Sequence, residues 1–223
     1  MTDPAAPVHT VTVAGRQWLD ADSFVLQCSR PDAFSFEAGQ HVSLFCEQEE
    51  RDYTLLSAPS AVDLRFLIKR VAGGKLSTRL AELAPGAVLA MSRAKGYLTY
   101  RSTDRPAVFV ATGVGIAPFV SMAAAGKTGY TLIQGARNPA GLYFRQELRA
   151  AAARYIPCVS GTTKAAADLP NLYPGRVTGA VKRFLEPGRY DVYLCGSRAM
   201  ITEMILLLDE HCPAARIYSE AYS

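Results

Sequence analysis

The chain has 223 residues, of which 49% are hydrophobic and 20% charged, so it can bury the core of one large domain or of two compact ones. Its formal net charge of +4 arises without a long basic run, which argues against a nucleic-acid surface and suits an acidic protein partner or a phosphorylated ligand. Its five cysteines include no CxxC pair, so we expect no disulfide framework, no metal site and no iron–sulfur cluster.

The first hundred residues predict short β-strands. Alternating or short apolar runs between Gly and Pro turns mark strands at residues 8–13, 23–28, 41–45 and 64–71. Short strands at this spacing favour a small antiparallel barrel. We also expect one helix at residues 76–83, where Leu76, Leu80 and Leu83 share a face before Pro85-Gly86 ends it.

From about residue 106, strands and helices alternate along the chain. The expected strands are residues 107–111, 130–134, 155–159, 190–195 and 215–218. The expected helices are residues 119–125, 142–155, 177–185 and 199–209. This alternation predicts an α/β domain with a parallel sheet covered by helices. A polar stretch ahead of Pro106 places the boundary between two domains, residues 1–102 and 103–223.

The N-terminus suggests no export signal, and no apolar stretch approaches the length of a membrane span. The N-terminus lacks a basic start followed by an apolar run, and the apolar run at residues 204–208 is too short to span a bilayer. We therefore expect a cytoplasmic protein with no membrane insertion.

The segment Arg51-Asp-Tyr-Thr54 carries the residue types that would hold a flat, phosphorylated cofactor. An arginine fork can clamp a pyrophosphate, and a tyrosine two residues along a strand, on the same face, can stack on a ring. The Thr54 hydroxyl could then bond a ring nitrogen or carbonyl. The simpler alternative is an edge strand with a surface Arg51 and a packed Tyr53.

The segment Gly73-Gly-Lys-Leu-Ser77 follows a predicted strand and opens the predicted helix. Backbone N–H groups at a helix N-terminus, unobstructed by side chains, suit phosphate oxygens, and Ser77 or Thr78 could add a hydroxyl donor. An ordinary glycine turn with a serine cap is the alternative.

Two further segments each follow a predicted parallel strand. Thr112-Gly-Val-Gly-Ile-Ala-Pro-Phe119 lies at a strand's carboxyl end, where open α/β sheets bind ligands, although it lacks the third glycine of the usual dinucleotide fingerprint. Cys195-Gly-Ser-Arg-Ala-Met200 has the same placement, and Cys195 could line a pocket as a small polarizable side chain. The alternatives are a tight turn and a buried structural thiol.

Taken together and in this order, RxYT, GGxxS, GxGxAPF and CGxxxM resemble the ferredoxin–NADP(H) reductase superfamily. The resemblance spans nearly the whole chain. It implies two domains: an FAD-binding antiparallel β-barrel over residues 1–102, then a nicotinamide-binding α/β parallel-sheet domain over residues 103–223.

The resemblance also implies roles for individual residues. On the FAD side these are Arg51, Tyr53 and Thr54, the strand backbone at Ile68 and Lys69, and the pyrophosphate cradle Gly74, Lys75, Leu76 and Ser77. On the nicotinamide side they are Thr112, Gly113, Pro118, Cys195, Gly196 and Met200.

The tail Tyr218-Ser-Glu-Ala-Tyr-Ser223 is similar to the family's C-terminus, with its aromatic residue penultimate. The resemblance implies that Tyr222 stacks on the flavin and moves to admit nicotinamide, and that Glu220 helps deliver protons. We therefore assign catalytic roles to Thr54, Cys195, Glu220 and Tyr222. For Glu220 a solvated carboxylate at the end of the chain is the alternative.

The nicotinamide preference is read from the turns that follow the second and third predicted strands. Arg137, Ser160 and Lys164 could form an anion pocket for a 2′-phosphate, and no acid occurs between Gln134 and Arg145. These turns favour NADP(H), although NAD(H) is possible. The alternative is that Arg137, Ser160 and Lys164 are solvated surface residues.

The expected activity is FAD-dependent electron transfer between NADP(H) and a one-electron protein carrier, a separate ferredoxin, with hydride passing between nicotinamide C4 and flavin N5. One rival is a flavin reductase that releases its flavin, which the pyrophosphate cradle at Gly74 to Ser77 disfavours. Another is an FAD-binding electron-transfer subunit that acts only inside a larger complex.

Overall fold

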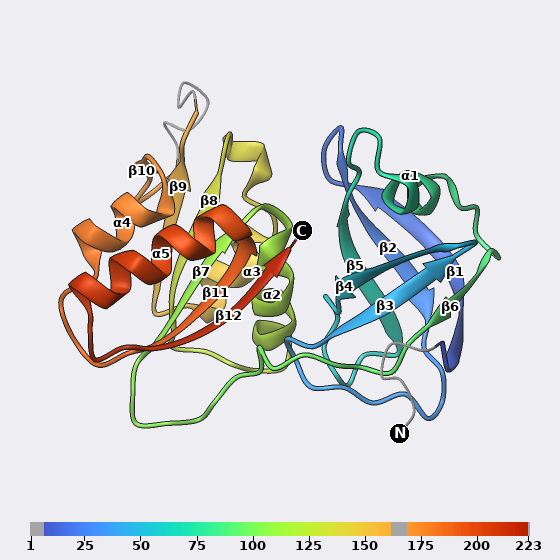
Figure 1. The fold of residues 1–223 in the computed structure, drawn as a ribbon, viewed down its shortest axis with the longest axis horizontal. Coiled ribbons are helices and arrows are strands. Elements are labelled where there is room, and N and C mark those ends of the chain that lie inside the picture. Colours follow the sequence, from blue (N-terminus) through green and yellow to red (C-terminus); the bar gives the residue numbers. More distant parts are fainter. Residues whose placement is uncertain (1–6, 162–168, 223) are drawn as a thin grey trace. The chain divides into compact units, whose positions relative to one another are not determined.

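The computed structural model describes residues 7–161 and 169–222, and the chain divides into two compact units, residues 1–100 and 101–223 (Figure 1). Each unit has its own sheet, and the two sheets differ in kind. Among the described residues, no helix is long and apolar enough to cross a membrane.

The first unit is built on six antiparallel strands in the order β4-β3-β6-β1-β2-β5. Its strands are β1 (His9–Trp18), β2 (Ser23–Ser29), β3 (His41–Cys46), β4 (Glu49–Thr54), β5 (Asp63–Lys69) and β6 (Val88–Met91). A bridge between Leu55 and Phe66 links the two outer strands, so the sheet nearly closes on itself. The predicted antiparallel barrel is confirmed.

The barrel core comes from the alternate side chains that each strand turns inward. Val11 and Val13 of β1 are buried, as are Val42 and Leu44 of β3. The helix α1 (Lys75–Glu82) adds its apolar face, which includes Leu80, to the same cluster. It begins one residue before the predicted helix and ends where the backbone at residue 83 becomes extended.

The second unit is a six-stranded parallel sheet in the order β10-β9-β8-β7-β11-β12, as predicted for this half. Its strands are β7 (Ala107–Thr112), β8 (Thr131–Ala136), β9 (Arg154–Val159), β10 (Tyr173–Pro174), β11 (Asp191–Ser197) and β12 (Arg216–Tyr222). Its α-helices are α2 (Ala117–Ala124), α3 (Arg145–Ala151), α4 (Val177–Phe184) and α5 (Arg198–His211), and its short 3₁₀ turns are η1 (Gly113–Ile116) and η2 (Pro139–Gly141).

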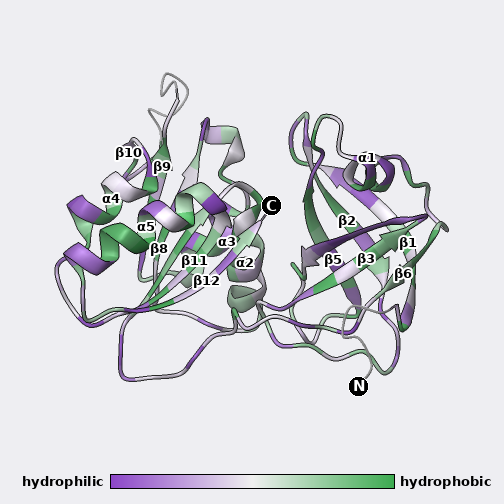
Figure 2. Cartoon of the chain, viewed as in Figure 1, coloured by the Kyte–Doolittle hydropathy of each residue, from purple (hydrophilic) through white to green (hydrophobic). Residues whose placement is uncertain are grey.

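Helices cover both faces of this sheet (Figure 1). On one face, α4 and α5 pack on alternate strand residues such as Val110 and Leu194. On the other face, Phe119 of α2 stacks on Phe109 of β7 at 4.6 Å between ring centroids. Figure 2 shows hydrophobic and hydrophilic residues alternating along α4 and α5, as expected of helices with one buried side.

The order of strands reverses between β7 and β11, because successive strands add on one side of β7 and then on the other. In open α/β sheets, such a switch point creates the crevice that receives ligands beyond the carboxyl ends of the strands. The carboxyl ends of β7 and β11 carry the two motifs of this half.

Two predicted elements differ in length from those observed. The helix expected at residues 142–155 is wrong at both ends, because Phe144 adopts φ 56° before α3 begins and strand β9 starts at Arg154. Its alanine-rich sequence suits a helix, but pairing of β9 with β8 overrides that preference. The last strand is longer than expected: β12 carries the tail into the sheet as far as Tyr222.

Candidate functional site

Strand β4, which carries Arg51-Asp-Tyr-Thr54, is the outermost strand of the barrel sheet. Arg51 and Tyr53 pair with inward-facing residues of β3 and therefore share one face, whereas Thr54 pairs with His41 on the other. Arg51 is exposed, and Thr54 is only 3% exposed. Tyr53 is half-buried against the barrel core, and this burial raises the pKa of its hydroxyl to about 12, so the ring stays neutral.

The Gly-Gly-Lys-Leu-Ser segment forms a tight loop that leads into α1. Gly73 has φ +76°, and a Cβ on Gly74 would lie 2.9 Å from the Ser77 hydroxyl oxygen. That oxygen accepts a hydrogen bond from the Val71 N–H (3.1 Å) and so closes the loop. Because Gly74 offers no side-chain cap, the first-turn N–H groups of α1 are available to an outside acceptor such as phosphate.

The structure brings these two motifs together through one carboxylate that the sequence analysis missed. Glu49 lies 3.1 Å from the Lys75 ammonium and 4.0 Å from the Arg51 guanidinium. The cations of both motifs therefore converge on one point, as an anion site requires. Glu49 stands two residues before Arg51 on the same strand face, and this spacing is the signal that could have found it.

The backbone predicted to contact the flavin lies on the opposite outer strand, β5. Ile68 is buried in the barrel core and Lys69 is exposed, so consecutive side chains point to opposite faces. Since β5 ends the strand order, the backbone of its last residues has a strand on one side only among the described residues. That free edge can offer N–H and C=O groups to a ligand.

In the second unit, the two glycine motifs pack directly against each other. A Cβ on Gly115 would lie 2.4 Å from the Cys195 carbonyl oxygen, so only glycine fits there. Gly196 has φ +154°, and a Cβ there would lie 2.3 Å from the Thr112 hydroxyl and 2.8 Å from the Met200 methyl group. This contact leaves little room between the backbones that follow β7 and β11.

The start of α2 completes this arrangement. Gly113 has φ +56°, which lets the chain turn at the end of β7 into the 3₁₀ turn. Pro118 is buried in the first turn of α2, a position where its missing N–H costs nothing. Ser197 caps α5 by accepting a hydrogen bond from the Met200 N–H (3.3 Å). Two helix N-termini therefore start next to the switch point.

The C-terminal strand places both predicted tail residues beside Cys195. In the register of β11 with β12, Cys195 pairs with Glu220 and Ser197 with Tyr222. Burial raises the pKa of the Cys195 thiol, the Glu220 charge raises it further, and a hydrogen bond with Tyr222 acts in the opposite direction. Because the Cys195 side chain is fully buried, the thiol stays protonated.

Arg137 and Ser160 follow adjacent strands and lie close together. The Gly161 N–H donates to the Arg137 carbonyl (2.9 Å), and the Ser160 N–H donates to the carbonyl of Ala136 (3.0 Å). Both side chains are exposed at the carboxyl edge of the sheet. Lys164, the third residue of the predicted anion pocket, lies outside the described residues.

A barrel with a cationic cradle, joined to a parallel sheet with a glycine-lined switch point, defines the class of FAD- and nicotinamide-dependent oxidoreductases. Comparison with known families agrees. Residues 11–100 match the oxidoreductase FAD-binding domain, and residues 109–205 match the oxidoreductase NAD-binding domain.

The chain belongs to the ferredoxin–NADP(H) reductase superfamily, which confirms the resemblance seen in its motifs. It has an FAD-binding and an NAD(P)-binding domain of the oxidoreductase type.

Among known proteins, the chain is similar to the propane 2-monooxygenase reductase component of Mycolicibacterium smegmatis, with 27% identity over 92% of this chain and 64% of that protein. It is also similar to the terephthalate 1,2-dioxygenase reductase component 2 of a Comamonas species, with 32% identity over 74% of this chain and 53% of that protein. The chain thus spans about half to two thirds of the length of these relatives.

Among solved structures, the fold is similar to a ferredoxin NADP+ reductase from Neisseria gonorrhoeae with bound FAD and NADP. The TM-score is 0.80 and the identity 22%, over 95% of this chain and 98% of that one. At this identity, the likeness concerns the fold.

Proposed function

We propose that the chain carries electrons between NADP(H) and a separate one-electron protein carrier of the ferredoxin type, with FAD as its bound cofactor. The observation that carries this proposal is the convergence within each unit. The cations of two motifs meet at Glu49 in the barrel, and the backbones of the other two meet at Gly115 and Gly196. Bound FAD supplies the redox chemistry, taking up two electrons with a hydride and releasing them singly.

On the barrel, the proposed roles follow from exposure and charge. Arg51, Lys75 and the N-terminus of α1 would hold the pyrophosphate, because they supply two cations and unobstructed N–H groups. The loop formed by Gly74, Leu76 and Ser77 fixes the position of those N–H groups. Tyr53 would stack on the flavin ring.

Strand β4 carries Arg51 and Tyr53 on one face and Thr54 on the other, where a second kind of contact can form. Thr54 would donate a hydroxyl hydrogen bond to the flavin ring, and the free edge of β5 at Ile68 and Lys69 would add backbone contacts. These groups would orient the ring rather than hold its charge.

On the parallel sheet, the proposed site lies at the carboxyl ends of β7 and β11. Thr112, Gly113 and Pro118 would line one side of the nicotinamide, and Gly196 and Met200 the other. Their close packing would exclude water from the reacting ring.

The tail would act as a movable cover over Cys195. Tyr222 would release its hydrogen bond with the thiol when nicotinamide enters. Glu220, paired with Cys195 across the strands, would hold the proton that exchanges with solvent.

The preference for NADP(H) rests on the turns after β8 and β9. Arg137 and Ser160 are exposed neighbours there, and Lys164 follows four residues after Ser160. A guanidinium and a hydroxyl are suitable partners for a 2′-phosphate.

The proposed partner is a separate acidic carrier. The net charge of +4 would steer such a protein toward the chain. Among similar proteins is the ferredoxin–NAD(P)+ reductase component of the naphthalene 1,2-dioxygenase system of Pseudomonas putida, 27% identical over the whole of this chain. Since similar proteins are reductase components of oxygenase systems, an electron-transfer subunit that acts only inside a larger complex is the second candidate.

The test is to purify the chain, record its FAD content, and measure NADPH and NADH oxidation with a soluble ferredoxin and with a dye. We expect one FAD per chain and a higher kcat/KM for NADPH. Arg137→Ala should lower kcat/KM for NADPH about tenfold and leave that for NADH unchanged. Arg149→Ala, an exposed residue on α3, is the matched control.

Three outcomes would contradict the proposal or one part of it. A chain that binds no FAD but reduces free flavin would be a flavin reductase. An unchanged NADPH-to-NADH ratio in Arg137→Ala would remove the proposed phosphate pocket. Activity with the dye but with no soluble carrier would favour the subunit of a larger complex.

A further inference from the structure

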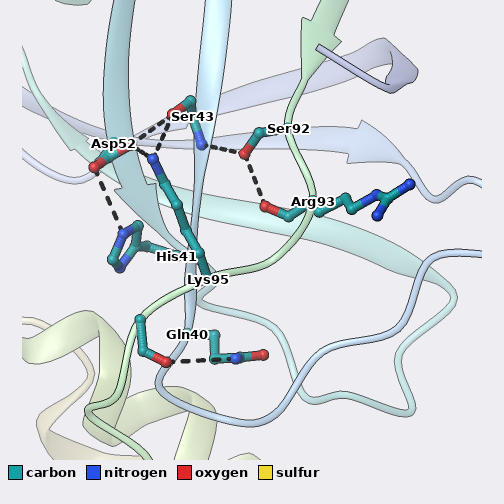
Figure 3. A network of polar contacts seen from close by, with 8 residues as sticks. Gln40, His41, Ser43, Asp52, Ser92, Arg93 and Lys95 are labelled. Carbon is teal, nitrogen blue, oxygen red and sulfur yellow. Dashed lines mark hydrogen bonds and ion pairs between the residues drawn. The ribbon is translucent and has the colours of Figure 1, made fainter. Parts of the chain in front are cut away.

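A network of polar side chains joins strands β3 and β4 to the segment after β6, and none of the proposed flavin contacts uses it (Figure 3). At its centre, the Asp52 carboxylate accepts hydrogen bonds from the Lys95 ammonium (2.8 Å) and from the Ser43 hydroxyl (2.7 Å). The His41 ring lies 3.5 Å from the other carboxylate oxygen. Lys95 also donates to the Ser43 hydroxyl (2.9 Å), so the ammonium is held by two partners.

The strand register places this network beside Thr54. Asp52 and Thr54 are two residues apart on β4 and therefore share a face, at a separation of about 7 Å. His41 pairs with Thr54 on one side and, through two backbone hydrogen bonds of 2.9 Å, with Lys95 on the other. The row Lys95, His41 and Thr54 thus crosses three neighbouring segments of the barrel.

The network carries two opposite charges that nearly cancel. Burial tends to raise the pKa of the Asp52 carboxyl, but the hydrogen bonds from Lys95 and Ser43 and the charges of His41 and Lys95 outweigh it and lower that pKa. Asp52 is therefore ionised at neutral pH. The Lys95 side chain is 24% exposed and that of Asp52 50%, so solvent screens this charge pair in part.

We propose that Asp52 and Lys95 form a charge pair that sets the reduction potential of the flavin next to Thr54. The inference rests on the proposed function, because it needs a flavin ring at Thr54. Reduction by two electrons and one proton gives the flavin one more negative charge than its oxidised form carries. A nearby cation favours that state and a nearby carboxylate opposes it. Asp52 and Lys95 are positioning and tuning residues, since neither needs to touch the ring.

The experiment measures the midpoint potential of the FAD-loaded chain at one fixed pH, by equilibration with a reference dye. Asp52→Asn keeps the size and an acceptor oxygen but removes the negative charge, so the potential should rise. Lys95→Met removes the positive charge, so the potential should fall. Each change should shift the ratio of reduced to oxidised flavin about three- to tenfold, a tenfold shift being about 30 mV for a two-electron couple.

Three further variants separate charge from structure. Lys95→Arg keeps the charge and should leave the potential unchanged, and the double variant Asp52→Asn with Lys95→Met should return it close to the wild-type value. Asp63→Asn removes the same charge at the start of β5, where the carboxylate contacts Gln27 and Arg65 instead, and should have little effect. If Lys95→Met does not fold, the rise in potential expected for Asp52→Asn, measured against Asp63→Asn, still tests the inference.

Single variants that shift the potential in the same direction, or by no more than Asp63→Asn does, would overturn the inference. A purely structural role would weaken FAD binding in both variants without producing opposite signs. Failure of the proposed function is distinguishable, because the wild-type chain would then bind no FAD and yield no potential.

Discussion

In the first unit the candidate site is made of side chains that reach solvent, whereas in the second it is made of buried backbone. Arg51 and Lys75 are exposed and share the carboxylate of Glu49. Gly115 and Gly196 instead leave no space for even one added carbon. The first arrangement is electrostatic, so single charge changes should alter binding in small steps. The second is steric, so it tolerates almost no added side-chain volume.

This difference predicts the size of the response to mutation. A charge held at the surface is screened by salt and can be replaced at modest cost. A backbone contact at van der Waals distance cannot widen without moving two strands. The predictions below test that contrast, beginning with the steric site.

Gly115→Ala should have the largest effect. The new Cβ would lie 2.4 Å from the Cys195 carbonyl oxygen, which is backbone and cannot rotate away. We expect the second unit to lose about 3 kcal/mol of its free energy of unfolding, together with NADP(H) binding. Denaturation followed by helical circular dichroism reports mainly this unit, because it holds α2 to α5. Fluorescence of Trp18, the only tryptophan, reports the first unit.

Gly15→Ala is the matched control for this prediction. A Cβ on Gly15 would meet nothing within 4 Å, so its effect should stay below about 0.5 kcal/mol. Equal destabilisation by the two variants would remove the steric account of the second site.

Arg51→Ala should have the next largest effect, and only on cofactor binding. It removes one charge-assisted partner of the pyrophosphate, so FAD affinity should fall about 10- to 100-fold while the fold stays intact. Titration by flavin fluorescence measures this loss. FMN, which has a single phosphate, should lose less affinity than FAD.

Arg65→Ala serves as the control, since Arg65 is an exposed arginine of the same barrel that pairs with Asp63. If Arg65→Ala weakened FAD binding as much as Arg51→Ala, the proposed pyrophosphate site would be in the wrong place.

Buried thiols should make the second unit more sensitive to alkali than the first. Burial raises the pKa of Cys28 in the barrel and of Cys158 in the second unit to about 12, and it also raises that of Cys195. A thiol whose pKa is higher in the folded than in the unfolded state stabilises the fold fully below its unfolded pKa of about 8.5. That stabilisation is lost as the pH rises toward the folded pKa.

Between about pH 8.5 and 10, each such thiol should lower the free energy of unfolding by about 1.4 kcal/mol per pH unit. Cys212 in the second unit is also buried, and burial raises its pKa. The second unit therefore has three buried thiols against one in the barrel and should lose stability more steeply. Cys158→Ala should lower the slope for the second unit by about a third, whatever it does to the stability at pH 7. Equal slopes for the two units would contradict this prediction.

Much of the fold could be predicted from the sequence because its pattern is local. The unbroken apolar run at 107–111 is typical of a strand buried on both faces, and the glycine turn after it marked a strand end that can receive a ligand. The alternating strands of the barrel were visible for the same reason. The short β6 was not, because four residues carry too little periodicity to stand out.

The sequence motifs named candidate residues, but the contacts between those residues depend on the fold. The sequence located Thr112 and Gly196, but only the register of β7 with β11 shows that they touch. Glu49, Asp52 and Lys95 were missed because their roles depend on partners in other strands. Such pairings arise from tertiary structure, which no local motif encodes.

The smallest predicted effect concerns the carboxylate at the centre of the cradle. Glu49→Gln frees Arg51 and Lys75 from a competing anion, so FAD should bind about threefold more tightly at low salt. The gain should disappear near 1 M salt, where the screening length falls to about 3 Å. Glu50→Gln, on the other face of β4, removes the same charge and should change nothing. If Glu49→Gln weakened FAD binding instead, Glu49 would position the two cations rather than compete for them, and the first site would resemble the second in depending on fixed geometry.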